Sequence, residues 1–182
     1  MVRGVLWVLA AILLGGIVHL STVLAMPEAA KQDAYSRLAQ LTPVNAMAPL
    51  AATKAGAEIM PFMDPAFAAA VCRYDLSDGP LKLIAPVSQG YTSVTFYTRR
   101  SVAFYAINDR AAGRHTIELD LMTAAQHAQV PEDEEVTAAD RLIIESPTIM
   151  GLIVLRALAP EPGLMPMARQ ALAAATCRIQ SQ

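Results

Sequence analysis

Charged side chains are scarce in this sequence, and those present nearly cancel. They make up 16% of the 182 residues, with 14 Lys and Arg against 16 Asp and Glu, whereas an average soluble protein has about 25%. The chain therefore lacks the basic stripe with which proteins bind nucleic acid, and we expect no nucleic-acid partner. So few charges indicate a surface that a membrane or another protein partly covers.

Familiar catalytic patterns are also missing. The sequence has no G-x-S-x-G nucleophile elbow, no phosphate loop and no dinucleotide fingerprint. It has only two cysteines, without a C-x-x-C motif or the His and Cys spacing of a zinc site. These absences favour a protein that is not an enzyme, and we expect no catalytic residue, cofactor or resident metal.

Two patterns in the sequence would instead fit a metal site. His115 and His127 could bind a metal together with Glu118 or Asp120. However, the two acidic residues alternate with aliphatic ones, which predicts that they lie on the water-facing side of a half-buried strand.

The second pattern consists of methionines. Met60 and Met63, and later Met165 and Met167, place thioethers close together in the sequence, and soft sulfur ligands can bind Cu(I). Methionine more often fills gaps in cores and interfaces. The sequence leaves open whether these four residues ever bind a metal.

The longest apolar run is Val5–Ala25, which has no Asp, Glu, Lys or Arg. As a helix at roughly 1.5 Å per residue it would be about 31 Å long, close to the hydrocarbon thickness of a bilayer. We predict a transmembrane anchor over residues 1–26. The alternative is a cleaved signal peptide, with Val5–Val18 as its apolar region and Val23–Ala25 before the cleavage site. The run continues past His19, which favours the anchor.

The charges around the span favour an amino terminus in the cytoplasm, because Arg3 is the only charged side chain before it. In a bacterium the anchor would then cross the inner membrane once, with the domain in the periplasm. Ala11, Gly15 and Gly16 have the small-residue spacing that lets transmembrane helices approach closely. His19 would face headgroups or a partner helix, or mark a ligand site. We therefore expect a protein partner in the membrane or the periplasm.

Residues 27–63 are expected to form a juxtamembrane helix over Glu28–Leu41, followed by a Pro- and Ala-rich linker. We place the start of the domain, residues 64–182, at Asp64. There an Asp-Pro pair predicts the first turn of a short helix that includes Cys72.

After this helix the pattern of apolar residues changes to the period of two that is typical of strands. These strands are expected over residues 81–86, 92–98, 101–108, 114–122, 141–146 and 151–159. Both faces of the hairpin at residues 91–107 are apolar, which predicts a central position. Thr123 is expected to cap a helical turn, and Pro166–Ile179 a closing helix. The predicted fold is α+β, a mostly antiparallel β-sandwich of about six strands with flanking helices.

The two cysteines, Cys72 and Cys177, lie outside the span in a domain that we place in an oxidising compartment, so we expect a disulfide. It would join the first and last helices of the domain. Closing a loop of about 100 residues is worth roughly 4–5 kcal/mol in the chain-entropy model.

One stretch resembles a known pattern, in which an acidic turn precedes an aliphatic strand ending in proline and an aromatic strand pair. The turn consists of Asp75, Leu76, Ser77, Asp78, Gly79 and Pro80. The stretch is similar to the bacterial domain of unknown function 1254 family, in particular its short, membrane-anchored exported members, over Asp64–Leu158. The cysteine pair suits these members. Where long members have an Arg-Pro-Asn-Asn-Asp-type stretch, this chain has AAAVCRY at residues 68–74.

The resemblance implies an envelope location and a β-rich domain, and it leaves the mechanism open. It also implies a possible partner, a short exported protein of the 1214 family of unknown function. We expect a non-enzymatic accessory or assembly subunit of an inner-membrane complex. The alternative is a periplasmic module that binds a small apolar or envelope-derived ligand in a cavity between sheet and helices.

Overall fold

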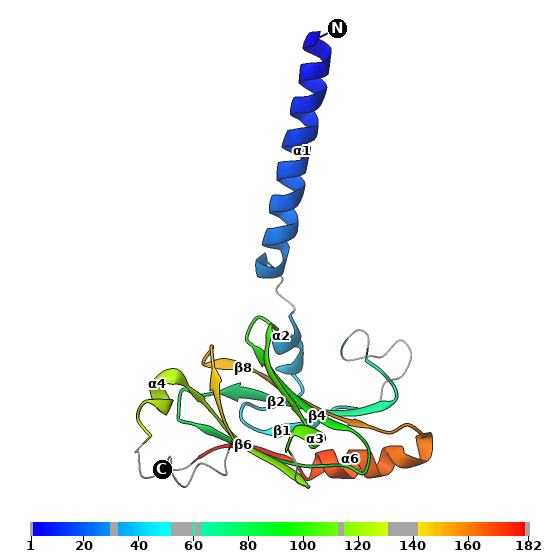
Figure 1. The fold of residues 1–182 in the computed structure, drawn as a ribbon, viewed down its shortest axis with the longest axis vertical. Helices are drawn as coiled ribbons and strands as arrows, with labels where there is room; N and C mark the ends of the chain where they lie inside the picture. The colour runs from blue at the N-terminus through cyan, green and yellow to red at the C-terminus, as the bar shows by residue number, and fades with distance from the viewer. Residues whose placement is uncertain are drawn as a thin grey trace. The chain divides into compact units, whose positions relative to one another are not determined.

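The computed structural model describes residues 2–29, 33–51, 60, 63–112, 115–130 and 142–180. It divides into two compact units, Met1–Asp33 and Ala34–Gln182, and the second is called the domain below. The first contains one helix, α1 (Val2–Ala29), drawn in blue in Figure 1. Its residues Val2–Met26 are long and apolar enough to cross a membrane, a test that a signal sequence also passes.

The domain consists of two β-sheets. Sheet A has five strands, all antiparallel to their neighbours. Its strands, in spatial order, are β1 (Met47–Pro49), β2 (Phe67–Asp75), β8 (Met150–Leu158), β4 (Thr92–Thr98) and β5 (Ala103–Asn108). Sheet B has four strands and contains one parallel pair, β6 with β7. Its strands, in spatial order, are β7 (Leu142–Ser146), β6 (Thr116–Thr123), β3 (Leu81–Pro86) and β9 (Thr176–Ile179).

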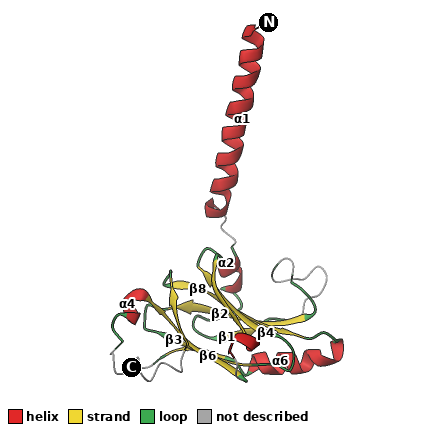
Figure 2. Ribbon diagram, viewed as in Figure 1, coloured by secondary structure: helices red, strands yellow, loops and turns green. Residues whose placement is uncertain are grey.

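The hydrophobic core lies between the sheets, because alternate residues of each strand point toward the opposite sheet. Sheet A contributes Phe96 and Ile153 to it, and sheet B contributes Leu83 and Leu119, all fully buried. Figure 2 shows the strands in yellow and the helices in red. The short helices in the described part of the domain are α2 (Ala34–Leu38), α3 (Asp109–Ala112), α4 (Ala124–His127) and the 3-10 helix η1 (Pro162–Leu164). The longer α6 (Met165–Ala173) packs on the core through Leu172.

The predicted α+β class and the two-sheet, largely antiparallel architecture are confirmed, and all six predicted strands are present. The predicted cap on α4 is also present, since Thr123 accepts a hydrogen bond from the backbone N–H of Gln126.

The helix predicted from Asp64 to Cys72 is wrong, because this segment enters strand β2. Asp64 accepts a hydrogen bond from the backbone N–H of Ala66, but this turn leads into a strand. Alternate residues of β2, including Ala70 and Cys72, are buried in the core. A run of alanines does not reveal this alternation in the sequence, since both faces of the strand look alike.

The closing helix predicted over Pro166–Ile179 is also too long. α6 ends at Ala173, and the chain then forms β9, which pairs with β3. The cysteine bridge therefore joins two strands instead of two helices.

Two further differences concern the edges of the domain. The compact unit begins at Ala34, well before Asp64, because α2 and β1 fold onto sheet A from within the segment predicted as helix and linker. The hairpin of β4 and β5 is not central, since β5 lies at the end of the strand order and Val102, just before it, is 62% exposed.

Candidate functional site

The face of sheet A that points away from the core is hollowed. On β2 and β8 the outward-facing residues Val71, Leu152 and Val154 form an apolar floor, over which α2 packs through Leu38. We call this space the apolar hollow, and its volume is about 360 Å³. That volume lies in the range of small-molecule sites, about 300–1,000 Å³. Its remaining lining residues are Ala34, Leu50, Met60, Met63, Asp64, Phe67, Ala69, Tyr97, Ser101 and Arg156.

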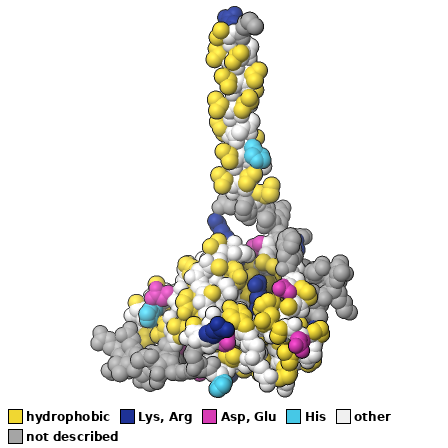
Figure 3. Space-filling model, turned by 45° about the vertical axis from the view of Figure 1, so that its right-hand side comes forward, with side chains coloured by type: hydrophobic (Ala, Val, Ile, Leu, Met, Phe, Trp, Pro, Cys, Tyr) yellow, Lys and Arg dark blue, Asp and Glu magenta, His cyan; other side chains and the backbone are white. Residues whose placement is uncertain are grey.

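A second hollow lies on the same face of sheet A, over β4 and β5. We call it the polar hollow, because Ser93, Thr95 and Asn108 are among the residues that line it. It also has a volume of about 360 Å³ and shares Phe67 and Arg156 with the apolar hollow. On the face of the molecule in Figure 3, hydrophobic side chains form broad patches with a few charged side chains set among them.

Arg156 lies on the boundary between the two hollows. In the strand register of sheet A it stands between Ala69 of β2 and Ser93 of β4. Its side chain is exposed. Within the described part of the chain, the structure gives Arg156 no hydrogen bond and no ion pair. Arg156 therefore places a positive charge on the outer face of sheet A, where the two hollows adjoin.

Helix α2 is held on sheet A by Tyr35, which is 6% exposed. The guanidinium carbon of Arg73 lies 4.4 Å from the centre of the Tyr35 ring, and that of Arg99 lies 4.2 Å from it. Such cation–π contacts are electrostatic attractions between a positive charge and the face of a ring. Arg73 also donates a hydrogen bond to the carbonyl of Thr42 at 3.1 Å. Tyr35 thus fixes one wall of the apolar hollow.

The turn that carries the family resemblance joins β2 of sheet A to β3 of sheet B. Asp75 begins it by accepting hydrogen bonds from the backbone N–H and the hydroxyl of Ser77. Leu76 is buried in the core, and its carbonyl accepts a hydrogen bond from Gln126. Gly79 has a φ of 138°, a conformation that favours glycine. These contacts lie where the chain crosses between the sheets. There Asp78 is exposed, and the carbonyl of Pro80 accepts a hydrogen bond from the backbone N–H of Gln180.

Tyr74 has a fully buried side chain with a satisfied hydroxyl group. The hydroxyl lies 3.0 Å from Ser146 Oγ and donates to the carbonyl of Tyr97 at 3.2 Å. Burial raises the pKa of the Tyr74 phenol, because a low-dielectric surrounding disfavours its charged form. This neutral phenol links β2 to β4 and to the end of β7.

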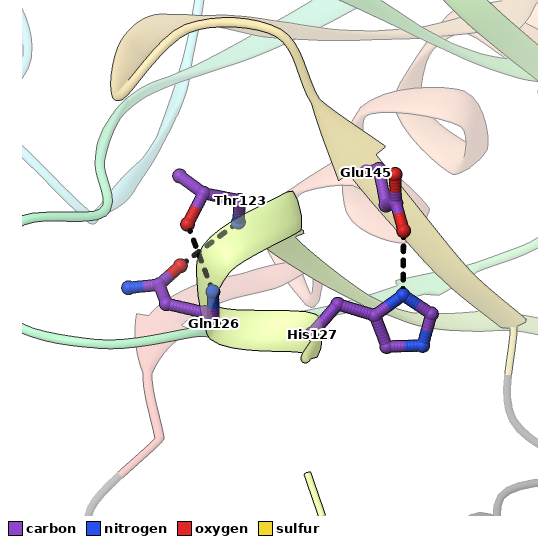
Figure 4. A network of polar contacts seen from close by, with 4 residues as sticks. All are labelled: Thr123, Gln126, His127 and Glu145. Atoms are coloured by element: carbon purple, nitrogen blue, oxygen red, sulfur yellow. Dashed lines mark hydrogen bonds and ion pairs between the residues drawn. The ribbon is translucent and has the colours of Figure 1, made fainter. Parts of the chain in front are cut away.

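The histidine and acidic residues considered as metal ligands do not come together. His127 Nδ1 lies 2.6 Å from Glu145 Oε1, beside the capped α4 turn (Figure 4). Glu118 is exposed, as predicted, and pairs with Lys82. Asp120 is only 3% exposed, contrary to the predicted alternation, because Gln180 covers it and donates a hydrogen bond to it. Among the described residues no group of three or more His, Cys, Asp and Glu could hold a metal.

Three of the four methionines considered as copper ligands line hollows of the domain. Met60 lines the apolar hollow. Met63 lines both that hollow and another at the end of sheet A, whose lining also includes Met165. Met167 is 42% exposed.

On α1, described as a separate unit, Ala11 and His19 are exposed. An added Cβ at Gly15 or Gly16 would meet no atom within 4 Å. This small-residue face is therefore open to another helix.

Cys72 and Cys177 form a disulfide, with 6.4 Å between their Cα atoms. The bond joins β2 of sheet A to β9 of sheet B through the core, and both residues are buried. The predicted pairing agrees with the structure, although the elements it joins differ.

Sequence reasoning did not locate the two hollows. One signal was present, because both faces of β8 read as apolar apart from Arg156. A strand with two apolar faces must be covered on both sides. The sequence alone does not show that α2 covers only part of the outer face.

The fold is similar to that of the VPA0106 protein from Vibrio parahaemolyticus, with a TM-score of 0.60 and 12% sequence identity over 81% of this chain and 33% of that one. An uncharacterized protein from Burkholderia cenocepacia gives a TM-score of 0.47 and 13% identity over 74% of this chain and 34% of that one. This chain thus spans about a third of the length of either protein. No curated protein matches it.

A family match covers most of the domain and includes β1, the Asp75–Pro80 turn and all the strands of sheet A. The resemblance seen in the turn is therefore confirmed at the level of the family. The chain belongs to the family described as Protein of unknown function (DUF1254), which matches residues 45–178.

Proposed function

We propose that this protein is a non-enzymatic accessory or assembly subunit of an inner-membrane complex, anchored by α1 with its domain in the periplasm. The observation that carries the proposal is the exposure of α1, whose apolar side chains from Val2 to Met26 are not buried in the structure. Exposed apolar surface of that extent requires cover by hydrocarbon or by another helix. Buried cystine in the domain supports an oxidising compartment.

A partner protein is part of this proposal. A short exported protein of the 1214 family of unknown function is the candidate partner. The open face of Gly15 and Gly16 on α1 offers it a contact inside the membrane.

The test is co-purification from membranes in a mild detergent, followed by mass spectrometry of the sized complex. We expect a 1214-family protein in a fixed ratio with the full chain, and we expect it to dissociate from a Gly15→Leu, Gly16→Leu variant. A Leu13→Ile variant, which changes the helix surface without filling the small-residue face, is the matched control. A wild-type chain that elutes as a monomer under these conditions contradicts the proposal.

A second candidate function is favoured by the apolar hollow. Its volume of about 360 Å³ and its apolar floor suit a small apolar or envelope-derived ligand. Organic extraction of the purified full chain tests this candidate directly. We expect a bound lipid-like molecule in the wild type and its loss in an Ala69→Phe variant, which fills the hollow. An extract without such a molecule from correctly folded protein contradicts it.

A further inference from the structure

The two hollows on sheet A differ in chemistry and adjoin each other. The apolar hollow has a floor of Val71, Leu152 and Val154, and the polar hollow contains Ser93 and Asn108. Both include Arg156 and Phe67 in their linings. A molecule that occupies both spaces must therefore have an apolar part and a polar part.

The positive charge of Arg156, between the two hollows, indicates what polar group such a molecule carries. Arg156 stands between Ala69 and Ser93 in the sheet register, and it has no partner within the described part of the chain. The other charged residue lining the apolar hollow is Asp64, which is exposed and already accepts the N–H of Ala66. Among the described lining residues of the polar hollow, no side chain is acidic. A negative headgroup fits beside Arg156, since a guanidinium binds a carboxylate or phosphate through two parallel hydrogen bonds.

The geometry of β8 defines the apolar part. Arg156, Val154 and Leu152 follow one another at every second position, so their side chains share one face of the sheet. The distance along the strand from Arg156 to Leu152 is about 13 Å at roughly 3.3 Å per residue. A medium-length alkyl chain would cover this distance and end beneath Leu38 of α2.

We propose that the outer face of sheet A binds a single-chain anionic amphiphile, with its headgroup on Arg156 in the polar hollow and its alkyl chain in the apolar hollow. This inference rests on the second candidate function above and names the class of ligand. Free fatty acids and anionic lysophospholipids, such as lysophosphatidylglycerol, share this chemistry. The anionic head distinguishes the ligand from a neutral or cationic one with the same chain.

The test uses the full chain in phosphatidylcholine nanodiscs and a photoactivatable laurate whose reactive group is at the end of its alkyl chain. Crosslinked peptides are mapped by mass spectrometry, so that labelling of α1 by probe dissolved in the bilayer is counted separately. We expect labelling of β2, β8 and α2. Unlabelled laurate should compete with this labelling, whereas dodecyltrimethylammonium, which carries the opposite charge, should not.

Substitutions at the boundary give the second measurement. Arg156→Gln should reduce labelling of the hollow about tenfold or more, because hydrogen bonds to charged groups contribute strongly to affinity. Arg156→Lys should retain part of it. Arg178→Gln removes an exposed arginine from β9 of sheet B and should leave labelling unchanged. Thermal unfolding of each variant identifies any loss of fold.

The outcomes distinguish the proposed binding module from the proposed anionic ligand. Competition by laurate or by lysophosphatidylglycerol supports the inference, and the stronger competitor identifies the source of the ligand. Equal competition by the cationic amphiphile overturns the anionic ligand while leaving an apolar binding module. Labelling confined to α1, with folded protein, overturns both. Equal labelling of wild type and Arg156→Gln also overturns the assignment of the headgroup to Arg156.

Discussion

At the scale of single residues, Tyr74 shows how burial couples the fold to pH. Burial raises the pKa of its phenol above the value of about 10 that it has in an unfolded chain. The unfolded state therefore loses this proton first as the pH rises. The stability that Tyr74 contributes is complete below about pH 10 and is lost as the pH rises through the higher, folded-state pKa.

We therefore predict that the free energy of unfolding falls more between about pH 8 and about pH 11 in the wild type than in Tyr74→Phe. At neutral pH the variant should lose only about 1 kcal/mol, the usual value of a buried hydrogen bond. Chemical denaturation at both pH values measures the difference. A parallel decline in the two proteins would show that Tyr74 does not ionise on unfolding.

Gly151 lies against Tyr74, where there is no room for a larger side chain. An added Cβ there would collide with the carbonyl of Tyr97 and the ring of Tyr74. We predict that Gly151→Ala destabilises the domain by about 1–3 kcal/mol, as overpacking of a core does. Gly163→Ala is the matched control, because a Cβ at Gly163 meets no atom within 4 Å. Equal unfolding midpoints for the two variants would contradict this account of the close approach.

At the scale of elements, the attachment of α2 depends on one ring. Tyr35→Ala removes a buried ring and two cation–π contacts, and we predict a loss of about 3 kcal/mol in the stability of this attachment. Tyr35→Phe keeps the ring and should behave like the wild type. Hydrogen exchange of residues 34–42 measures the effect. Unchanged protection in Tyr35→Ala would mean that other contacts hold the helix.

The alternation of residues along each strand explains which elements can be predicted from the sequence. β4 and β6 contain β-branched and aromatic or aliphatic residues in alternation, so their period of two is visible in the sequence. In β2 three alanines follow Phe67, so the two faces of this part of the strand look identical and the sequence predicts a helix there. β9 follows an Ala-rich helix after a short break, and its strand conformation depends on pairing with β3. Pairing of this kind is tertiary information.

At the scale of the whole molecule, the disulfide joins the two sheets across a sequence separation of 105 residues. We predict that a Cys72→Ala, Cys177→Ala variant is less stable by about 3–5 kcal/mol, because the bond restricts the unfolded chain over a long loop. Denaturation with and without a reducing agent measures this. The reducing agent should weaken the wild type and leave the variant unchanged. An equal response of both would contradict a stabilising bond.

The spatial order of the strands could not be predicted, because β2 pairs with β8 and β4 also pairs with β8, far apart in sequence. The candidate site also depends on pairing between strands that are far apart in sequence. Arg156 and Ser93 are ordinary residues of separate strands until sheet A places them side by side. The apolar helix α1 was easier to predict, since a single continuous segment carries the whole signal.

We propose above that α1 remains in the membrane and keeps the domain outside the cytoplasm. The direct measurement is protease treatment of intact spheroplasts from a bacterial host, combined with intact-mass analysis of the chain in the alkali-washed membrane pellet. We predict that the full-length chain, with α1, is found in the pellet and that the domain is lost when protease is added outside. A chain found in the soluble fraction with α1 cleaved off, or a domain protected until the membrane is lysed, would contradict it.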